Sequence, residues 1–214
     1  MNYIVIENLT KTIKNNTILN NIDLSLEKNK IYGFVGINGS GKTMLLRAIA
    51  GLVKYNSGKI TVGGIEIKNG THPKNSGLLI ENADLWADLT AMENMLILNQ
   101  LSNSKASTES IKEILTYFGL DPESQKAYKA FSLGMKQKLR IVQAFMGEPE
   151  LIILDEPTNA LDENSVIKLR RYILDRKENG ATVLLASHSQ TEIEFLCDEI
   201  IFMNEGKITK KAVK

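Results

Sequence analysis

Residues 36–43 read GINGSGKT, and this stretch decides how the rest of the chain is interpreted. The apolar run IYGFV (31–35) before it is typical of a buried strand, and MLLRAIAGLV (44–53) after it has the spacing of a helix. Glycines let backbone N–H groups face phosphate oxygens without a Cβ in the way, and a helix start adds the positive end of its dipole. The pattern G-x-x-x-x-G-K-[ST] between a strand and a helix therefore predicts a loop that binds a nucleoside triphosphate.

Two side chains of this loop have specific expected roles. Lys42 is expected to reach the β- and γ-phosphates, and the hydroxyl of Thr43 is expected to ligate Mg²⁺. An ordinary glycine-rich turn is the alternative, and the strand and helix on either side disfavour it. The residues expected to contact the nucleotide here are Gly36, Asn38, Gly39, Ser40, Gly41, Lys42, Thr43 and Met44.

A second acidic motif, LIILDEPTNALD (151–162), follows far along the chain. Its apolar run predicts a buried parallel strand, and ligands bind beyond the carboxyl ends of such strands. Asp155 is therefore expected to hold Mg²⁺, through water, and Glu156 to orient or deprotonate the attacking water. An acidic pair at a strand end is a weak signal alone and a strong one downstream of a phosphate loop.

Composition narrows the class of protein. The 214 residues, 43% of them hydrophobic, suffice for one core, with room for an inserted lobe. A net charge of +1 favours no nucleic-acid partner. The start of the chain lacks a signal-peptide pattern, and its hydrophobic runs fall short of the ~20 residues that cross a bilayer. The single cysteine, Cys197, cannot form an internal disulfide, which fits a reducing compartment.

The order of the predicted elements indicates an α/β fold. Alternation of apolar and polar residues predicts two half-exposed strands, at YIVIENL and ILNNIDLSL. A hairpin is predicted at SGKITVGGIEI, and further strands are predicted at GLLI, LIIL, TVLLAS and EIIFM. Between 90 and 145 the pattern is helical, with capping-box spacing at Thr90 and Glu93. Strands that alternate with helices imply a mostly parallel sheet, interrupted here by a helical insertion. The final KKAVK is expected to be a solvated tail.

With FSLGMKQKLR (131–140) and ASH (186–188), these motifs resemble the ATPase subunit of an ATP-binding cassette (ABC) transporter over residues 3–207. The family's signature, commonly LSGGQ, is FSLGM here, with Ser132 and Gly134 retained. The resemblance implies a P-loop NTPase (RecA-like) core with a mostly parallel sheet, an N-terminal antiparallel β-subdomain and an inserted α-helical subdomain. It implies one domain over 1–214, with the ATP-binding core at 1–81 and 147–214 and the helical subdomain at 82–146.

The resemblance also implies an activity and partners. ATP and Mg²⁺ would be the cofactors, and ATP hydrolysis would drive a separate transmembrane permease from the inner face of the cell membrane. Two such subunits, alike or paralogous, would sit head to tail, so that Ser132 and Gly134 of one close over the ATP of the other. Asp162 matches the D-loop between the subunits. His188 matches the switch histidine that contacts the γ-phosphate, although a lone histidine is more often a structural hydrogen-bonding group.

Glu81 departs from the family pattern. Most members have glutamine at this position, where the side chain touches Mg²⁺ and the attacking water. A carboxylate is a stronger Mg²⁺ ligand than an amide oxygen, so Glu81 is expected to contribute to the metal site and to catalysis. Glu81 and SLGMKQ resemble the exporters that protect bacteria from lantibiotics and bacitracin-like peptides. A tolerated neutral change is the alternative, and Glu81→Gln is expected to alter transport more than ATP binding.

Two further positions concern the base and the permease. Ile13 occupies the place where the family stacks adenine on an aromatic ring, and isoleucine offers apolar contact without a π face. Since base–aromatic stacking contributes about 1–3 kcal/mol in nucleic-acid complexes, comparable use of ATP and GTP is expected. Trp86 lies where the family receives a coupling helix of the permease. It is either an anchor for that partner or packing for the helical lobe.

Two rival classes remain. An ABC ATPase outside transport would carry a long coiled-coil insertion or a second cassette, and this chain has neither. An unrelated P-loop kinase or GTPase would need no FSLGM, and the guanine-reading N-K-x-D is absent at Asn29–Lys30. Within transport, the exported substrate is either a peptide antibiotic or another compound.

Overall fold

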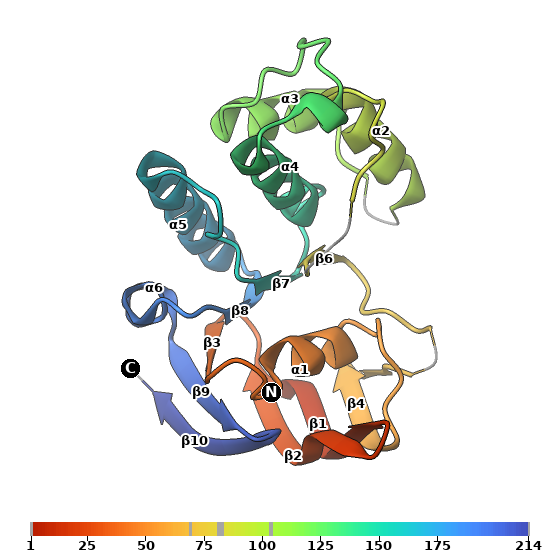
Figure 1. Cartoon of the computed structure of the whole chain (residues 1–214), viewed down its shortest axis with the longest axis vertical. Helices are drawn as coiled ribbons and strands as arrows, with labels where there is room; N and C mark the ends of the chain where they lie inside the picture. The colour runs from red at the N-terminus through yellow and green to blue at the C-terminus, as the bar shows by residue number, and fades with distance from the viewer. Residues whose placement is uncertain (1, 69, 81–83, 103–104, 214) are drawn as a thin grey trace.

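Two β-sheets and the helices packed around them build the described part of the molecule (Figure 1). The computed structural model describes residues 2–68, 70–80, 84–102 and 105–213. A four-stranded antiparallel sheet has the order β2-β1-β4-β5, and a six-stranded sheet has the order β10-β9-β3-β8-β7-β6. The predicted α/β architecture, with an antiparallel N-terminal sheet and a mostly parallel central sheet, is confirmed.

The bounds of the elements follow. The strands are β1 (Asn2–Ile13), β2 (Asn16–Glu27), β3 (Ile31–Val35), β4 (Ser57–Val62), β5 (Ile65–Glu66), β6 (Ser76–Leu79), β7 (Leu151–Asp155), β8 (Thr182–Ala186), β9 (Glu199–Asn204) and β10 (Lys207–Val213). The helices are α1 (Lys42–Ile49), α2 (Ala91–Leu101), α3 (Thr108–Tyr117), α4 (Leu133–Phe145), α5 (Glu163–Glu178) and α6 (Gln190–Leu196), with a 3₁₀ turn at Tyr128–Ala130.

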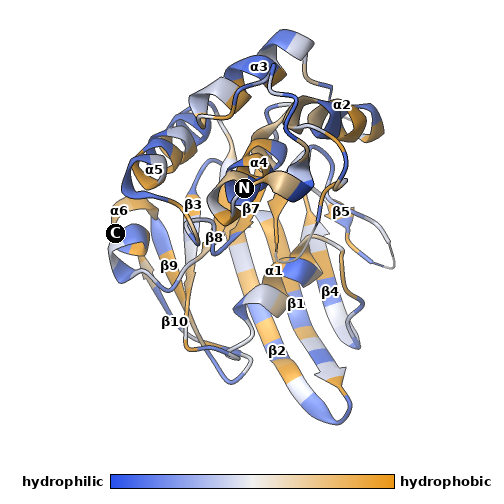
Figure 2. Ribbon diagram, turned by 45° about the horizontal axis from the view of Figure 1, so that its top comes forward, coloured by the Kyte–Doolittle hydropathy of each residue, from blue (hydrophilic) through white to orange (hydrophobic). Residues whose placement is uncertain are grey.

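Two inner strands of the six-stranded sheet, β7 and β8, are buried on both faces. Every residue of β7 and β8 is buried, as expected for parallel strands covered on both sides. Figure 2 shows these strands in the colour of hydrophobic residues, whereas β1 and β2 alternate in colour because one face meets solvent. The parallel register pairs Asp155 with Ala186, so β7 and β8 end at the same edge of the sheet. The segments that follow both strands are therefore neighbours.

The predicted helical insertion forms α2, α3 and α4 at one end of the molecule, away from the antiparallel sheet (Figure 1). The expected capping box is present at the start of α2, where Thr90 and Glu93 satisfy each other's backbone N–H groups. The insertion shares a hydrophobic core with one face of the central sheet. The two approach closely at Gly77 of β6, where a Cβ would lie 1.7 Å from the carbonyl oxygen of Ala144 in α4.

Two local expectations differ from the structure. The first helix begins at Lys42, inside the glycine motif, and ends at Ile49, so it is shorter than the apolar run. The expectation of a solvated tail at KKAVK was wrong, because residues 210–213 belong to β10, which pairs antiparallel with β9. The hairpin turns at Glu205 and Gly206, both with positive φ, which matches the right-handed twist of paired strands. The side chains of β10 are mostly exposed, so composition alone resembled a tail.

Candidate functional site

The glycine-rich loop connects β3 to α1 and leaves the start of the helix open. Gly41 is the N-cap of α1 and has φ of +103°, a conformation that L side chains rarely adopt. At Gly36 a Cβ would lie 2.2 Å from the carbonyl oxygen of Met203, so a side chain is excluded there as well. The loop thus presents backbone N–H groups and the positive end of α1 to one cavity.

Lys42 is held within this loop. The residue is 6% exposed, and Nζ donates hydrogen bonds to the carbonyl oxygens of Gly36 (2.7 Å) and Ile37 (3.2 Å). Burial lowers the pKa of Lys42, and the nearby carboxylates of Glu156 and Asp155 oppose that shift. The ammonium group is therefore desolvated and aimed across the loop, where an anionic group would stabilise its charge.

Glu156 follows the end of β7 in an unusual backbone conformation. Its φ is +48°, in the left-handed region that costs a non-glycine residue about 1–3 kcal/mol. Its N–H donates to the carbonyl oxygen of Ala186 (2.9 Å), which ties it to the end of β8. Burial raises the pKa of Glu156, and His188 opposes the shift. A raised pKa suits a carboxylate that must exchange a proton near neutral pH.

His188 lies directly beside this carboxylate. Its Nε2 is 3.1 Å from Oε1 of Glu156, and its backbone N–H donates to Oε2 (3.3 Å). The structure therefore brings three motifs, far apart in the sequence, around one cavity of about 290 Å³. Its lining residues are Ile18, Asn38, Gly39, Ser40, Gly41, Lys42, Thr43, Met44, Glu156 and His188.

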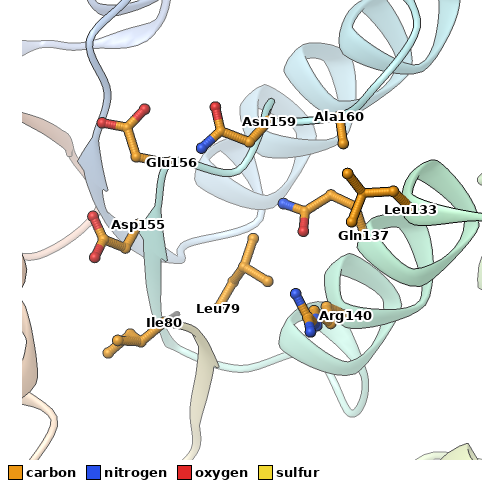
Figure 3. A pocket seen from close by; sticks show the side chains of 9 residues that line it. All are labelled: Leu79, Ile80, Leu133, Gln137, Arg140, Asp155, Glu156, Asn159 and Ala160. Atoms are coloured by element: carbon orange, nitrogen blue, oxygen red, sulfur yellow. The ribbon is translucent and has the colours of Figure 1, made fainter. Parts of the chain in front are cut away.

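Asp155 is one of the residues that line an adjoining cavity of about 160 Å³ (Figure 3). In this view Asp155 and Glu156 extend from the end of β7, and Gln137 and Arg140 of α4 lie across the opening. Gln137 is buried, and its Nε2 donates to the carbonyl oxygen of Pro157 (2.9 Å), next to Glu156. The helix that begins with FSLGM is therefore bonded directly to the segment that carries the acidic pair.

The signature residues lie at the start of α4. Ser132 is the N-cap, and its Oγ accepts a hydrogen bond from the N–H of Met135 (3.2 Å). Gly134 is close to the D-loop, since a Cβ there would lie 3.0 Å from the carbonyl oxygen of Ala160. Leu133, which replaces the family's small residue, is 70% exposed. Ser132 and Gly134 do not line the phosphate-loop cavity of their own chain.

Two residues expected at the nucleotide also lie away from that cavity. Asp162 caps α5 by accepting hydrogen bonds from the N–H and Oγ of Ser165, and it forms an ion pair with Lys138 of α4 (3.2 Å). These hydrogen bonds, with Lys138, lower the pKa of Asp162 to about 2. Ile13 ends β1 and is 41% exposed, whereas Ile18 of β2 lines the cavity. The sequence pattern did not indicate Ile18, because tertiary contacts place it at the loop: its carbonyl oxygen would lie 3.0 Å from a Cβ on Gly41 and 2.4 Å from one on Gly206.

Glu81 lies outside the described residues. The residue before it, Ile80, lines the same cavity as Asp155. Beyond the gap, Trp86 is 43% exposed in a loop that the buried side chain of Asn94 fastens to α2. The structure thus leaves part of the indole accessible to a partner and holds its backbone in place.

Within the described residues, no helix is both long enough and apolar enough to span a membrane. The same residues contain no group of three or more His, Cys, Asp or Glu side chains that could hold a metal ion. Mg²⁺ commonly takes only one or two carboxylates and completes its shell with water and substrate phosphates. Thr43 and Asp155 supply oxygen donors of the type that this coordination uses.

Comparison with known proteins gives a consistent result. A family model described as "ABC transporter" matches residues 19–159. The chain is 43% identical over 202 residues to an uncharacterized ABC transporter ATP-binding protein, YybJ, of Bacillus subtilis. The aligned residues cover 94% of this chain and 92% of that relative. It is 39% identical to the lantibiotic transport ATP-binding protein SrtF of Streptococcus pyogenes (95% and 87% covered). It is 38% identical to the bacitracin transport ATP-binding protein BcrA of Enterococcus faecalis (99% and 70%).

Solved structures agree with these relatives. The fold matches an ATP-binding subunit of an ABC transporter with a TM-score of 0.89 and 26% identity, over 99% of this chain and 90% of the other. It matches the dimeric structure of the bacterial ABC transporter cassette MJ0796 with a TM-score of 0.87 and 25% identity, over 98% of both chains.

Proposed function

The chain belongs to the ABC transporter family as an ATP-binding, ATP-hydrolysing subunit, and from this premise we propose that it powers a separate permease that exports peptide antibiotics. The observation that carries the proposal is the similarity to SrtF and BcrA, at 38–39% identity over 95–99% of the chain. Export of another substrate is the alternative, because the similarity to YybJ is higher and that protein is uncharacterized.

The phosphate loop is the proposed binding site for the triphosphate. Lys42 would exchange the carbonyl oxygens of Gly36 and Ile37 for phosphate oxygens, a stronger electrostatic interaction for a desolvated ammonium group. The proposed backbone contacts are Gly36, Asn38, Gly39, Ser40, Gly41 and Met44. Ile18, and Ile13 from the hairpin beside it, are proposed to contact the base or ribose.

Glu156 and His188 are proposed to act together in hydrolysis. Glu156 would accept a proton from the attacking water, a role that its partly buried position and raised pKa support. His188, 3.1 Å from the same carboxylate, would hold its orientation and donate toward the terminal phosphate. Mg²⁺, when bound, would neutralise charge on the phosphates. Thr43, Asp155 and Glu81 are the residues proposed to hold it directly or through water.

A head-to-tail dimer is the proposed working form. Ser132 and Gly134 lie at the exposed start of α4, away from their own phosphate loop, so they are available to the nucleotide of a second subunit. Asp162 would contribute by holding the start of α5 against α4 rather than by touching nucleotide. The dimeric cassette with the same fold supports this arrangement. The subunit would act at the inner face of the membrane, through the permease.

A combined assay tests the proposal. The membrane protein that co-purifies with the chain is identified and expressed with it in a sensitive bacterium, and growth is measured against bacitracin and a lantibiotic. The proposal predicts protection by wild-type protein and loss of protection by Glu156→Gln, at equal expression. Protection that survives in Glu156→Gln would refute energy coupling through this site. Absence of protection, with intact ATP hydrolysis and a co-purifying permease, would refute the choice of substrate.

A further inference from the structure

Glu192 of α6 is a fully buried acidic side chain that the proposed chemistry does not use. Its residue exposure is 0%. Acidic residues are almost never fully buried unless they are paired, because removing the carboxyl group from water is costly. The position of this group therefore requires specific partners.

Two hydroxyl groups donate to the same oxygen atom of Glu192. Oγ of Ser187 lies 2.6 Å from Oε2, and Oγ1 of Thr158 lies 3.3 Å from it. The shorter distance falls in the range of strong hydrogen bonds to carboxylates. The other oxygen, Oε1, is buried and has no hydrogen-bond partner among the residues that the structure describes. Glu192 thus bridges the segments that contain Thr158 and Ser187, two residues that are 29 positions apart in the sequence.

One bridged segment carries His188. Oγ of Ser187 donates to Glu192 and accepts a hydrogen bond from the N–H of Ser189 (3.1 Å). Oγ of Ser189 in turn accepts from the N–H of Glu192 (3.3 Å). The residues on both sides of His188 are therefore fixed to the start of α6, and the imidazole projects from a short anchored segment.

The other bridged segment carries Glu156. Thr158 is two residues beyond Glu156, and the N–H of Asn159 donates to the carbonyl oxygen of Glu156 (3.3 Å), which closes this segment into a turn. Glu192 therefore ties the turn after β7 to the segment after β8. These are the two segments whose side chains, Glu156 and His188, approach to 3.1 Å.

A purely local role in the helix does not account for this geometry. Ser189-x-x-Glu192 has capping-box spacing, in which the glutamate would accept a hydrogen bond from the N–H of the capping serine. Here that N–H donates to Ser187 instead, and the Glu192 carboxyl group turns toward Ser187 and Thr158. The side chain has exchanged a contact within its own helix for contacts to two neighbouring segments.

We propose that Glu192 is a positioning residue that holds Glu156 and His188 in register for ATP hydrolysis, through Thr158 and Ser187. The inference rests on the proposed catalytic roles of Glu156 and His188. Loss of the bridge allows the two segments to move independently, while the phosphate loop keeps its own contacts. Hydrolysis is therefore expected to fall and nucleotide binding to persist.

The test measures kcat for ATP hydrolysis and Kd for ATP, together with the melting temperature, for purified full-length protein. Glu192→Ala is expected to lower kcat about tenfold, a loss of the size that one or two hydrogen bonds can produce, with Kd within about twofold. Glu192→Gln should recover part of the rate, since its amide oxygen can accept both hydroxyl groups but does so more weakly than a carboxylate. Glu194→Gln, an exposed acid on the same helix, is the matched control and should keep the wild-type kcat.

Single-hydroxyl variants keep the test decisive if Glu192→Ala folds poorly. Ser187→Ala and Thr158→Val should each lower kcat in the wild type, should lower it further in Glu192→Gln, which keeps an acceptor for the hydroxyl groups, and should add nothing in Glu192→Ala. The inference would be overturned if Glu192→Ala kept the wild-type kcat, or if the hydroxyl substitutions lowered kcat additively in Glu192→Ala. It would also be overturned if Glu192→Ala lowered kcat and ATP affinity equally. Failure of the proposed function is separately visible, because wild-type protein would then lack hydrolysis or Glu156→Gln would retain it.

Discussion

The substitution Asn94→Ala tests how the loop that carries Trp86 is held in place. The side chain of Asn94 is fully buried at the start of α2. Oδ1 accepts from the N–H of Trp86 (2.8 Å), and Nδ2 donates to the carbonyl oxygens of Thr90 (2.9 Å), Trp86 (3.2 Å) and Leu89 (3.3 Å). One side chain thus fixes both ends of the loop that exposes Trp86.

The loss of stability expected for Asn94→Ala depends on which backbone groups lose their only hydrogen-bond partner. The three carbonyl groups keep backbone partners, because they also accept from the N–H groups of residues 89, 94 and 128. The two short hydrogen bonds contribute about 0.5–1.5 kcal/mol each, and an unsatisfied N–H at Trp86 costs about 1–3 kcal/mol. We expect a loss of about 3 kcal/mol in the free energy of unfolding, against a typical total of about 5–15 kcal/mol, so the variant still folds.

Urea unfolding measures this loss, and Gln100→Ala, an exposed change on the same helix, is the control. The control should stay within about 0.5 kcal/mol of the wild type. Because the phosphate loop is remote from these contacts, Asn94→Ala should keep ATP hydrolysis in the isolated subunit and lose co-purification of the permease. A loss below about 1 kcal/mol would refute the hydrogen-bond reasoning. Undiminished co-purification, despite the expected loss of stability, would refute the role of the loop.

Three further predictions follow from single residues. Gly77→Ala should destabilise the protein by about 3 kcal/mol in urea unfolding, because its Cβ would overlap the carbonyl oxygen of Ala144; a change below about 0.5 kcal/mol would contradict this. The raised pKa of Glu156 means that the folded state favours its neutral form, so its ionisation opposes folding at higher pH. Glu156→Gln should therefore be at least as stable as wild type at pH 8 in thermal melts, and its advantage should shrink as pH falls; lower stability at pH 8 would contradict this. The pKa of Asp162 is lowered to about 2 in the folded protein, so its ionised carboxylate stabilises the fold above the unfolded pKa of about 3.9, and this stabilisation is lost as the pH falls toward 2. Asp162→Asn should therefore be less stable than the wild type at pH 7, and this difference should disappear in acid. A difference in stability that does not change with pH would refute the reasoning.

The sequence predicted much of the fold because its patterns are local. Buried runs such as LIIL and TVLLA form strands that are buried throughout, and the capping box at Thr90 marks the start of α2. The edge strand β10 was missed because an exposed edge strand has the polar composition of a tail. The feature that could have indicated β10 is the turn at Asn204–Gly206. Its last two residues have positive φ, as a tight hairpin turn between β9 and β10 requires.

The site was predictable where motifs sit at the ends of strands. Lys42, Glu156 and His188 each follow or precede a recognisable strand, and the parallel register brings them together. Residues whose role depends on tertiary contacts were not predictable in this way. Ile18 reaches the cavity through contacts with Gly41 and Gly206, and Glu192 bonds to Thr158, 34 residues before it, as well as to nearby Ser187.

Sedimentation velocity of the Glu156→Gln protein, saturated with ATP and Mg²⁺, tests the central claim most directly. Two subunits that each offer Ser132 to the neighbour's phosphate loop should sediment as a dimer, and the same protein without nucleotide should sediment as a monomer. A species that stays monomeric with saturating nucleotide, at high protein concentration and with its permease present, would contradict the account.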